Sequence, residues 1–348
     1  MSLLRIGFPL LLACSASVGH SQAPGELIFA PGSASFSSSH ASTIVELNDG
    51  SLQAAWFGGS HEGATDVAIW TAKRTAKGWS APVELVREAQ VPCWNPVLFH
   101  SRDGRLWLYY KFGPSPDTWA AARKYSLDEG LTWSAVERLP AGLLGPIRAK
   151  PLVIDEGVIV SGTSFEAYHS WAIWIERSTD DGKTWTKIGP ILPALGPGKT
   201  STPETGKING LIQPSVVRLG KGHLRLYARS TSDIARICAA DSFDNGLTWT
   251  SAHPLDVPNP NSGIDAVALR DGRVVLIYNN STSERTPLNL AVSRDGEHFQ
   301  NFKTLESEPG EYSYPAIIQN SQGDLEMTYT WNRKSIKHVH SPLQDVLQ

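Results

Sequence analysis

One eight-residue phrase recurs along this chain and constrains its fold more than any other feature. The pattern Ser-x-Asp-x-Gly-x-Thr-Trp occupies 126–133, 178–185 and 242–249, and a shortened copy at 293–299 ends in Phe299. Trp79 marks the place where a more degenerate copy would lie. The terminal aromatic residues follow one another at intervals of 50 to 64 residues, and such self-similarity indicates a repeat architecture.

Each copy of the phrase has the composition of a hairpin turn. Its Asp supplies a side-chain acceptor for nearby backbone N–H groups, its Gly permits a positive φ, and its Trp can pack between sheets. Runs that alternate apolar and polar residues flank the copies, at 105–110, 224–227 and 273–278. With a last strand group at 325–331, the five anchors predict an all-β fold, a six-bladed β-propeller with these turns in its blades.

Composition is consistent with one large domain. The chain has 348 residues, 41% of them hydrophobic, and contains no long polar or Pro-rich run that would serve as a linker. Because the period continues through the midpoint, we expect a single domain over 24–348. The formal net charge is −3 and no basic block is present, which argues against nucleic acid or an anionic membrane as partner.

The first 23 residues have the pattern of a signal peptide. Arg5 precedes an apolar run at 6–13 that is too short to span a bilayer, and small residues follow. We expect export of a monomer that has no transmembrane segment, either secreted or periplasmic. The segment 11–14 is similar to a bacterial lipoprotein cleavage box, so the alternative is a signal that ends before Cys14, with a lipid anchor there. Cys93 and Cys238 remain in the mature chain, where we expect two buried thiols.

The repeated phrases resemble the Asp boxes of the sialidase (neuraminidase) superfamily, and the order of other segments is similar over nearly the whole mature chain. The resemblance implies a six-bladed propeller whose Asp boxes lie on the blade periphery, with the site where strand-end loops converge. It also implies a glycan substrate. Because sialic acid carries a carboxylate on its anomeric carbon, such a site needs guanidinium groups and uses a Tyr nucleophile with a separate acid.

Three residues take roles through this resemblance. The segment 312–315, Tyr-Ser-Tyr-Pro, is similar to the one that carries the nucleophile, which places that role on Tyr312. Arg229 ends a strand pattern similar to that of a carboxylate-binding arginine. Arg285 lies between the third Asp box and the fourth, where another such arginine is expected. Each has a structural alternative, since a Tyr can be a packed aromatic and an Arg at a strand end can form a surface ion pair.

The loop at 58–66 occupies the first-blade position of the acid/base. Glu62 is the first choice for that role and Asp66 the second. Asp66 leads directly into a strand, so the alternative is that it only accepts backbone hydrogen bonds. Two other family features are altered. The family's Arg-Ile-Pro phrase is replaced by Ser-His-Ala-Ser-Thr at 39–43, which leaves His40 either to bind anions when protonated or to act as a general acid or base.

The second alteration concerns the acid that should polarise the nucleophilic Tyr. It is expected near 210–215, where Gln213 is neutral, and Glu204 in the preceding loop is the candidate substitute. The other distinctive phrases resemble a bacterial and plant group of sialidase-like proteins. Polar residues beside Pro, Gly or strand ends suit a sugar-binding rim, although each also suits an ordinary turn: Asn95, Arg148, Lys150, Glu166, Gln213 and Asn261.

Three functions fit these patterns. The first is an exported exo-glycosidase that removes a terminal acidic sugar, sialic acid or a related ulosonic or uronic acid. The second is a polysaccharide lyase for uronic acids, with His40 and Tyr312 as the acid/base pair. The third is a non-catalytic carbohydrate-binding propeller. We expect no metal and no cofactor, because metal-binding and phosphate-binding motifs are absent from the sequence.

Overall fold

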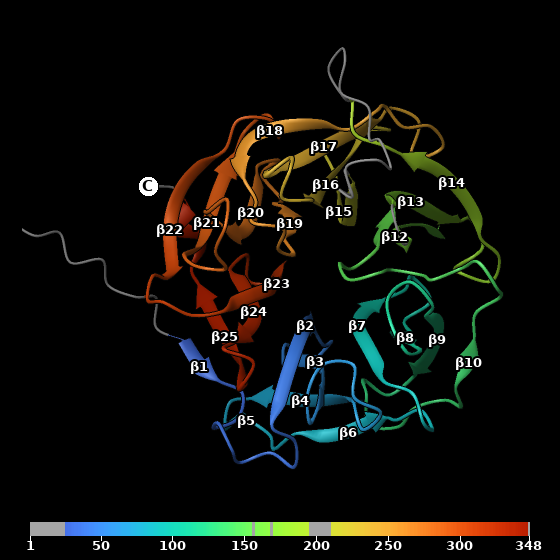
Figure 1. The fold of residues 1–348 in the computed structure, drawn as a ribbon, viewed down its shortest axis with the longest axis vertical. Coiled ribbons are helices and arrows are strands. Elements are labelled where there is room, and N and C mark those ends of the chain that lie inside the picture. The colour runs from blue at the N-terminus through green and yellow to red at the C-terminus, as the bar shows by residue number, and fades with distance from the viewer. Residues whose placement is uncertain (1–24, 155–156, 168–169, 195–209, 347–348) are drawn as a thin grey trace, which may run out of the picture.

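The computed structural model describes residues 25–154, 157–167, 170–194 and 210–346. The segment 1–23, Cys14 and Glu204 lie outside these residues. Six antiparallel sheets stand like blades around a central axis, which Figure 1 shows end-on. The prediction of an all-β, six-bladed propeller is therefore confirmed.

In blades 1 and 2 the first strand, β2 or β7, lies nearest the axis, and the later strands follow outward (Figure 1). Blade 1 also contains a fifth strand, β6, which pairs with β4. The strands of the first three blades are β2 (Ser38–Glu46), β3 (Leu52–Gly59), β4 (Ala68–Thr75), β5 (Gly78–Trp79) and β6 (Val83–Val86); β7 (Cys93–His100), β8 (Leu106–Phe112), β9 (Ala120–Ser126) and β10 (Glu137–Arg138); and β11 (Leu152–Ile154), β12 (Val158–Ala167), β13 (Ser170–Ser178) and β14 (Thr186–Ile191).

The last three blades follow the same plan, and a short 3-10 helix, η3 (Leu343–Val346), comes after them. Their strands are β15 (Leu211–Arg218), β16 (Leu224–Ser230), β17 (Arg236–Ser242) and β18 (His253–Pro258); β19 (Asp265–Ala268), β20 (Val274–Asn279), β21 (Leu288–Ser293) and β22 (Gln300–Glu306); and β23 (Tyr312–Gln319), β24 (Leu325–Trp331), β25 (Ser335–Ser341) and β1 (Gly25–Leu27).

The ring closes through strand β1, which is the outermost strand of blade 6. It pairs antiparallel with β25, with Glu26 opposite His338. His338 also contacts Glu326 on β24, where its Nε2 lies 2.8 Å from Oε2. Because β1 precedes blade 1 in the chain, its pairing with β25 ties the first part of the described chain to the last blade.

The Asp boxes form the turns between the third and fourth strands, as their composition predicts. In the first copy, Thr132 N donates to Asp128 Oδ1 at 2.8 Å, and Trp133 Nε1 donates to the Gly130 carbonyl at 3.2 Å. The hydrogen bonds from Thr132 lower the pKa of the Asp128 carboxyl to about 2. The copies at 178–185 and 242–249 repeat this geometry, so their role is structural.

Four of the innermost strands carry a bulge near their first residues. The pairing register shifts in β2, β7, β15 and β23, and the bulged residues have positive φ angles. A bulge interrupts the regular alternation of side chains between the two faces of a strand, so a bulged residue can point to the face opposite to the one that alternation predicts. The residues at these positions are Ala41, Asn95, Gln213 and Tyr314.

Cys93 and Cys238 are buried and unpaired, as predicted. Burial raises the pKa of each thiol to about 12. No helix within the described ranges is long and apolar enough to cross a membrane.

Candidate active site

A polar cluster forms where the innermost strands begin and the second strands end. We call it the axial site, and its members come from blades 1, 3, 4, 5 and 6. His40 and Tyr314 lie in β2 and β23, Gln213 lies on the bulge of β15, Arg229 ends β16, and Arg285 lies in the β20–β21 connection. Antiparallel order brings these strand ends to one end of the propeller. The axial site consists of His40, Arg148, Gln213, Arg229, Arg285 and Tyr314.

Tyr314 is the centre of this cluster. Its hydroxyl oxygen accepts hydrogen bonds from Arg229 Nη1 at 2.7 Å and from Gln213 Nε2 at 3.1 Å. The guanidinium carbons of Arg148, Arg229 and Arg285 lie 5.7–5.8 Å from its ring centroid. Donors and positive charge placed in this way stabilise negative charge that develops on the phenolic oxygen.

Arg229 is held by neutral groups only. Its Nε donates to Asn261 Oδ1 at 2.7 Å, and its Nη1 also donates to Gln213 Oε1 at 3.3 Å. Within the part of the chain that the structure describes, it forms no ion pair with a carboxylate. Its charge is therefore available to an anionic ligand, for which a guanidinium is well suited.

Arg285 differs because it is already paired. Its Nη1 lies 2.7 Å from Glu311 Oε1, and Glu311 also accepts from Arg333 Nε at 2.9 Å. Arg333 in turn pairs with Glu62, so an ion chain runs from the β20–β21 connection to the first-blade loop. Burial raises the pKa of Glu311, but the hydrogen bonds from Arg333 outweigh this effect and hold the pKa below its ordinary value. No role was predicted from the sequence for Glu311 or Arg333.

His40 lies against the Tyr314 ring, with 4.2 Å between the ring centroids. Its Nδ1 is 2.9 Å from Thr330 Oγ1, and its buried Nε2 has no hydrogen-bond partner among the described residues. Burial, followed by the nearby arginines, holds the pKa of His40 well below its ordinary value. A neutral imidazole fits the expectation of an acid or base and does not fit anion binding in the protonated form.

Arg148, at the base of the axial site, and Lys150, just outside it, are structural groups. Both Nη atoms of Arg148 donate to the Pro315 carbonyl at 2.7 Å, and the Ile264 carbonyl accepts as well. Lys150 Nζ pairs at 2.8 Å with the buried Asp265. These contacts join the innermost strands of blades 5 and 6. The structure thus gives Arg148 a supporting position behind Tyr314, in place of the predicted position on a rim.

Tyr312, the predicted nucleophile, does not belong to the axial site. It is buried in a hydrophobic cluster between blades 5 and 6, with Leu288 and Tyr329 among the members. Burial raises the pKa of its hydroxyl. Residues two apart share a face of a regular strand, but the bulge at Tyr314 breaks that alternation and turns Tyr314 toward the axis.

The two predicted acids occupy different environments. Asp66 accepts from the backbone N and the hydroxyl of Ser60, at 3.0 and 2.9 Å, so it stabilises its own turn as the structural alternative stated. Glu62 is 39% exposed at its side chain and pairs with Arg333. Asn95 is buried on the β7 bulge, and Asn261 orients Arg229.

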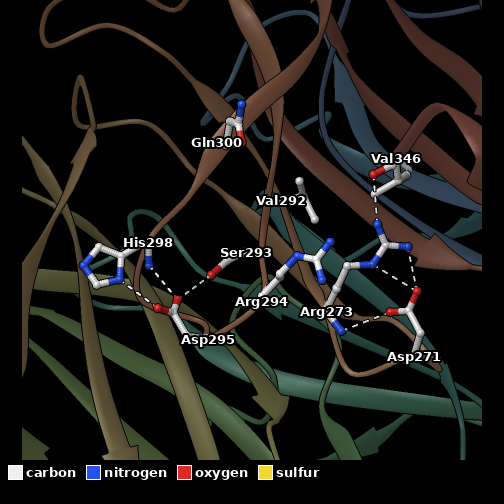
Figure 2. A pocket seen from close by; sticks show the side chains of 9 residues that line it. All are labelled: Asp271, Arg273, Val292, Ser293, Arg294, Asp295, His298, Gln300 and Val346. Carbon is white, nitrogen blue, oxygen red and sulfur yellow. Dashed lines mark hydrogen bonds and ion pairs between the residues drawn. The ribbon is translucent and has the colours of Figure 1, made fainter. Parts of the chain in front are cut away.

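A separate pocket of about 580 Å³ lies at the opposite end of the strands (Figure 2). The β19–β20 turn and the fourth Asp box form it. Its two carboxylates are already engaged, Asp271 by Arg273 and Asp295 by Ser293 and His298. The carboxylates that line this pocket are therefore not free to act as an acid or a nucleophile, and the axial site is the better candidate for catalysis. Within the described ranges no group of three or more His, Cys, Asp or Glu could hold a metal ion.

Comparison with known proteins gives the family of this chain. Residues 50–327 match the BNR repeat-like domain family. A curated protein named sialidase, from Bacteroides fragilis strain YCH46, is 26% identical over 251 residues, which are 67% of this chain and 44% of that protein. The chain thus spans less than half the length of this relative.

Solved structures show the same fold at low identity. A protein of unknown function from Dyadobacter fermentans superposes with a TM-score of 0.75 at 15% identity, covering 94% of this chain and all of that one. A Hadza microbial sialidase superposes with a TM-score of 0.74 at 18% identity, over 92% of this chain and 68% of that one. A mutant of the NanB sialidase from Streptococcus pneumoniae superposes with a TM-score of 0.73 at 15% identity, over 92% and 71% of the two chains. From the family match, the fold and the Asp boxes, this chain belongs to the BNR repeat-like domain family as a divergent sialidase-like member.

Proposed function

We propose that this protein is an exo-glycosidase that hydrolyses a terminal acidic sugar, sialic acid or a related ulosonic or uronic acid, from glycans. The observation that carries the proposal is the contact between Tyr314 and Arg229, which forms no ion pair with any described carboxylate. An anionic sugar placed over this pair would have its carboxylate on Arg229 and its anomeric carbon near a polarised phenol. The name of the B. fragilis relative supports the same class of activity.

In this proposal Tyr314, not Tyr312, is the nucleophile. Arg229 binds the substrate carboxylate, and Arg285 lies close enough to the Tyr314 ring to assist it. Gln213 cannot accept a proton from the phenol, but its amide donates to the phenolic oxygen and so stabilises negative charge there. We further propose that residues 1–23 direct export, so that the substrate is met outside the cytoplasm.

One observation favours a second candidate, a lyase that acts on uronic acids. His40 is neutral, buried and unpartnered at Nε2, and it lies against Tyr314. A neutral imidazole beside a phenol can remove a proton next to a carboxylate, with the arginines stabilising the resulting charge. Such a reaction adds no water to the released sugar.

Product analysis separates the two reactions. Purified protein lacking 1–23 would be incubated with sialylated and uronate-containing glycans, and the products weighed by mass spectrometry, with Tyr314→Phe and the matched control Tyr312→Phe. Release of a hydrated acidic monosaccharide that is lost only in Tyr314→Phe supports the glycosidase. A product lighter by one water that comes from a uronate-containing glycan and shows the ultraviolet absorbance of a double bond conjugated to its carboxylate identifies the lyase. Glycan binding without any product from the unaltered protein would contradict both and indicate a binding propeller.

A further inference from the structure

The β12–β13 hairpin of blade 3 brings another carboxyl group to the axial site. Ser164 on β12 accepts a hydrogen bond from Gln213 N at 3.2 Å, so this side of the strand faces the bulge of β15. A Cβ on Gly162 would lie 2.7 Å from the Pro214 carbonyl, on the same side. Because alternate residues share a face, Glu166 also projects toward blade 4 and the end of the axial site.

The neighbours of Glu166 support this placement. It lies opposite Trp171 in the β12–β13 pairing. The guanidinium carbon of Arg229 is 5.7 Å from the Trp171 ring centroid. Trp171 also packs against the start of β15, because a Cβ on Gly210 would lie 2.5 Å from its Cβ. Glu166 is therefore a near neighbour of the arginine that contacts Tyr314.

Glu166 differs in its partners from the other carboxylates of the region. Glu62 and Glu311 form ion pairs with arginines, and Asp66 accepts from its own turn. Glu166 has no hydrogen bond or ion pair within the described ranges. Burial raises its pKa, and the carboxylates of Glu62 and Asp117 raise it further against the opposing effect of Arg229. Catalytic acids require a pKa shifted upward in this manner.

We propose that Glu166 is the carboxylic acid that protonates the leaving group, in place of Glu62 and Asp66. This rests on the glycosidase proposed above. As the glycosidic C–O bond breaks, its electron pair goes to the leaving oxygen, which takes the proton of Glu166. Tyr314 forms the new bond to the anomeric carbon and releases its phenolic proton to solvent. Water then attacks that carbon, giving a proton to the Glu166 carboxylate, while the bond to Tyr314 breaks and the phenolate is reprotonated.

The experiment compares leaving groups. A general acid matters most for a poor leaving group such as the lactose of sialyllactose, and least for the phenol of a 4-methylumbelliferyl sialoside. We expect Glu166→Gln to lose about 10²–10⁴-fold in kcat on sialyllactose and far less on the aryl sialoside. Glu62→Gln, which removes the competing candidate, should lose less than Glu166→Gln on sialyllactose, and Tyr314→Phe should lose activity on both substrates. Equal losses of Glu166→Gln on both substrates, or a larger leaving-group effect in Glu62→Gln than in Glu166→Gln, would overturn the assignment while leaving the glycosidase in place.

A second measurement does not depend on turnover. The infrared carbonyl band of a protonated carboxylic acid would be recorded across pH as the difference between the unaltered protein and Glu166→Gln. A carbonyl band that disappears only above the pH range in which a Glu ordinarily loses its proton supports the inference. The absence of such a band overturns the inference. If the unaltered protein releases no sugar from either substrate, the glycosidase itself fails, and with it the catalytic role of Glu166, whatever the infrared band shows.

Discussion

Replacement of Arg229 by methionine would test whether its guanidinium binds the anionic group of the ligand. Methionine keeps an unbranched apolar chain, but it removes the charge and the donors that reach Asn261, Gln213 and Tyr314. Tyr314 keeps the second donor, Gln213 Nε2, so the phenol stays anchored. The variant therefore changes the charge of the site more than its shape.

The expected loss of affinity follows from the hydrogen bonds that the ligand would make with the guanidinium of Arg229. A hydrogen bond to a charged group contributes about 1.5–3 kcal/mol, and 1.4 kcal/mol is a factor of about ten in Kd. We expect Arg229→Met to weaken binding of an acidic monosaccharide by about 10- to 150-fold. Arg285→Met should weaken binding less, because Glu311 already neutralises Arg285.

The assay is isothermal titration calorimetry with N-acetylneuraminic acid and glucuronic acid, each compared with its carboxamide. The carboxamides carry no charge and should bind the unaltered protein and Arg229→Met with similar affinity. Thermal unfolding of each variant would confirm that the fold is intact. An equal loss for acid and amide, or a larger loss in Arg285→Met than in Arg229→Met, would refute the assignment of the anion site.

Three further predictions concern stability and reactivity. Asp265→Asn removes the buried partner of Lys150 and should lower the free energy of unfolding by about 3 kcal/mol in urea denaturation; a change below about 1 kcal/mol would contradict the pairing. The thiols of Cys93 and Cys238, with pKa values of about 12, should react with a thiol reagent at neutral pH only after unfolding, so fast labelling of the folded protein would contradict their burial. Burial raises the pKa of Glu326, but hydrogen bonds from His338 and His340 outweigh that effect and hold the pKa below its ordinary value. The contribution of Glu326 to stability is therefore present above the pKa of the unfolded state and is lost as the pH falls through the folded-state pKa. Melting temperatures across acidic pH should fall less in Glu326→Gln than in the unaltered protein, and an equal fall would contradict this role.

The fold was predictable because its determinants are local. Each Asp box closes its turn with hydrogen bonds between residues at most four apart, so the phrase alone specifies the hairpin and its repetition specifies the blades. These features need no knowledge of distant contacts.

The axial site was less predictable because bulges and long-range pairs determine it. Tyr312 and Tyr314 stand two apart, and only the bulge decides which of them faces the axis. One signal was present in the sequence, since the bulged residues of β7, β15 and β23 all precede a proline: Asn95-Pro96, Gln213-Pro214 and Tyr314-Pro315. Glu311 and Arg333 gave no comparable signal, because their roles arise from an ion chain whose other members lie elsewhere in the sequence.

Gln213 stands where the family resemblance predicts the acid that polarises the nucleophilic Tyr, and the consequence of this difference can be measured directly. Its Nε2 donates to Tyr314 and its Oε1 accepts from Arg229, so Gln213→Glu would place a carboxylate against both groups without changing the size of the side chain. The carboxylate can take the phenolic proton, and general-base assistance contributes about 10²–10⁴-fold when fully developed. It also neutralises part of the charge on Arg229, which weakens binding of an anionic substrate. We therefore expect kcat and KM for an acidic glycoside to rise together, and a fall in kcat would show that the amide donor on the phenolic oxygen matters more than a proton acceptor.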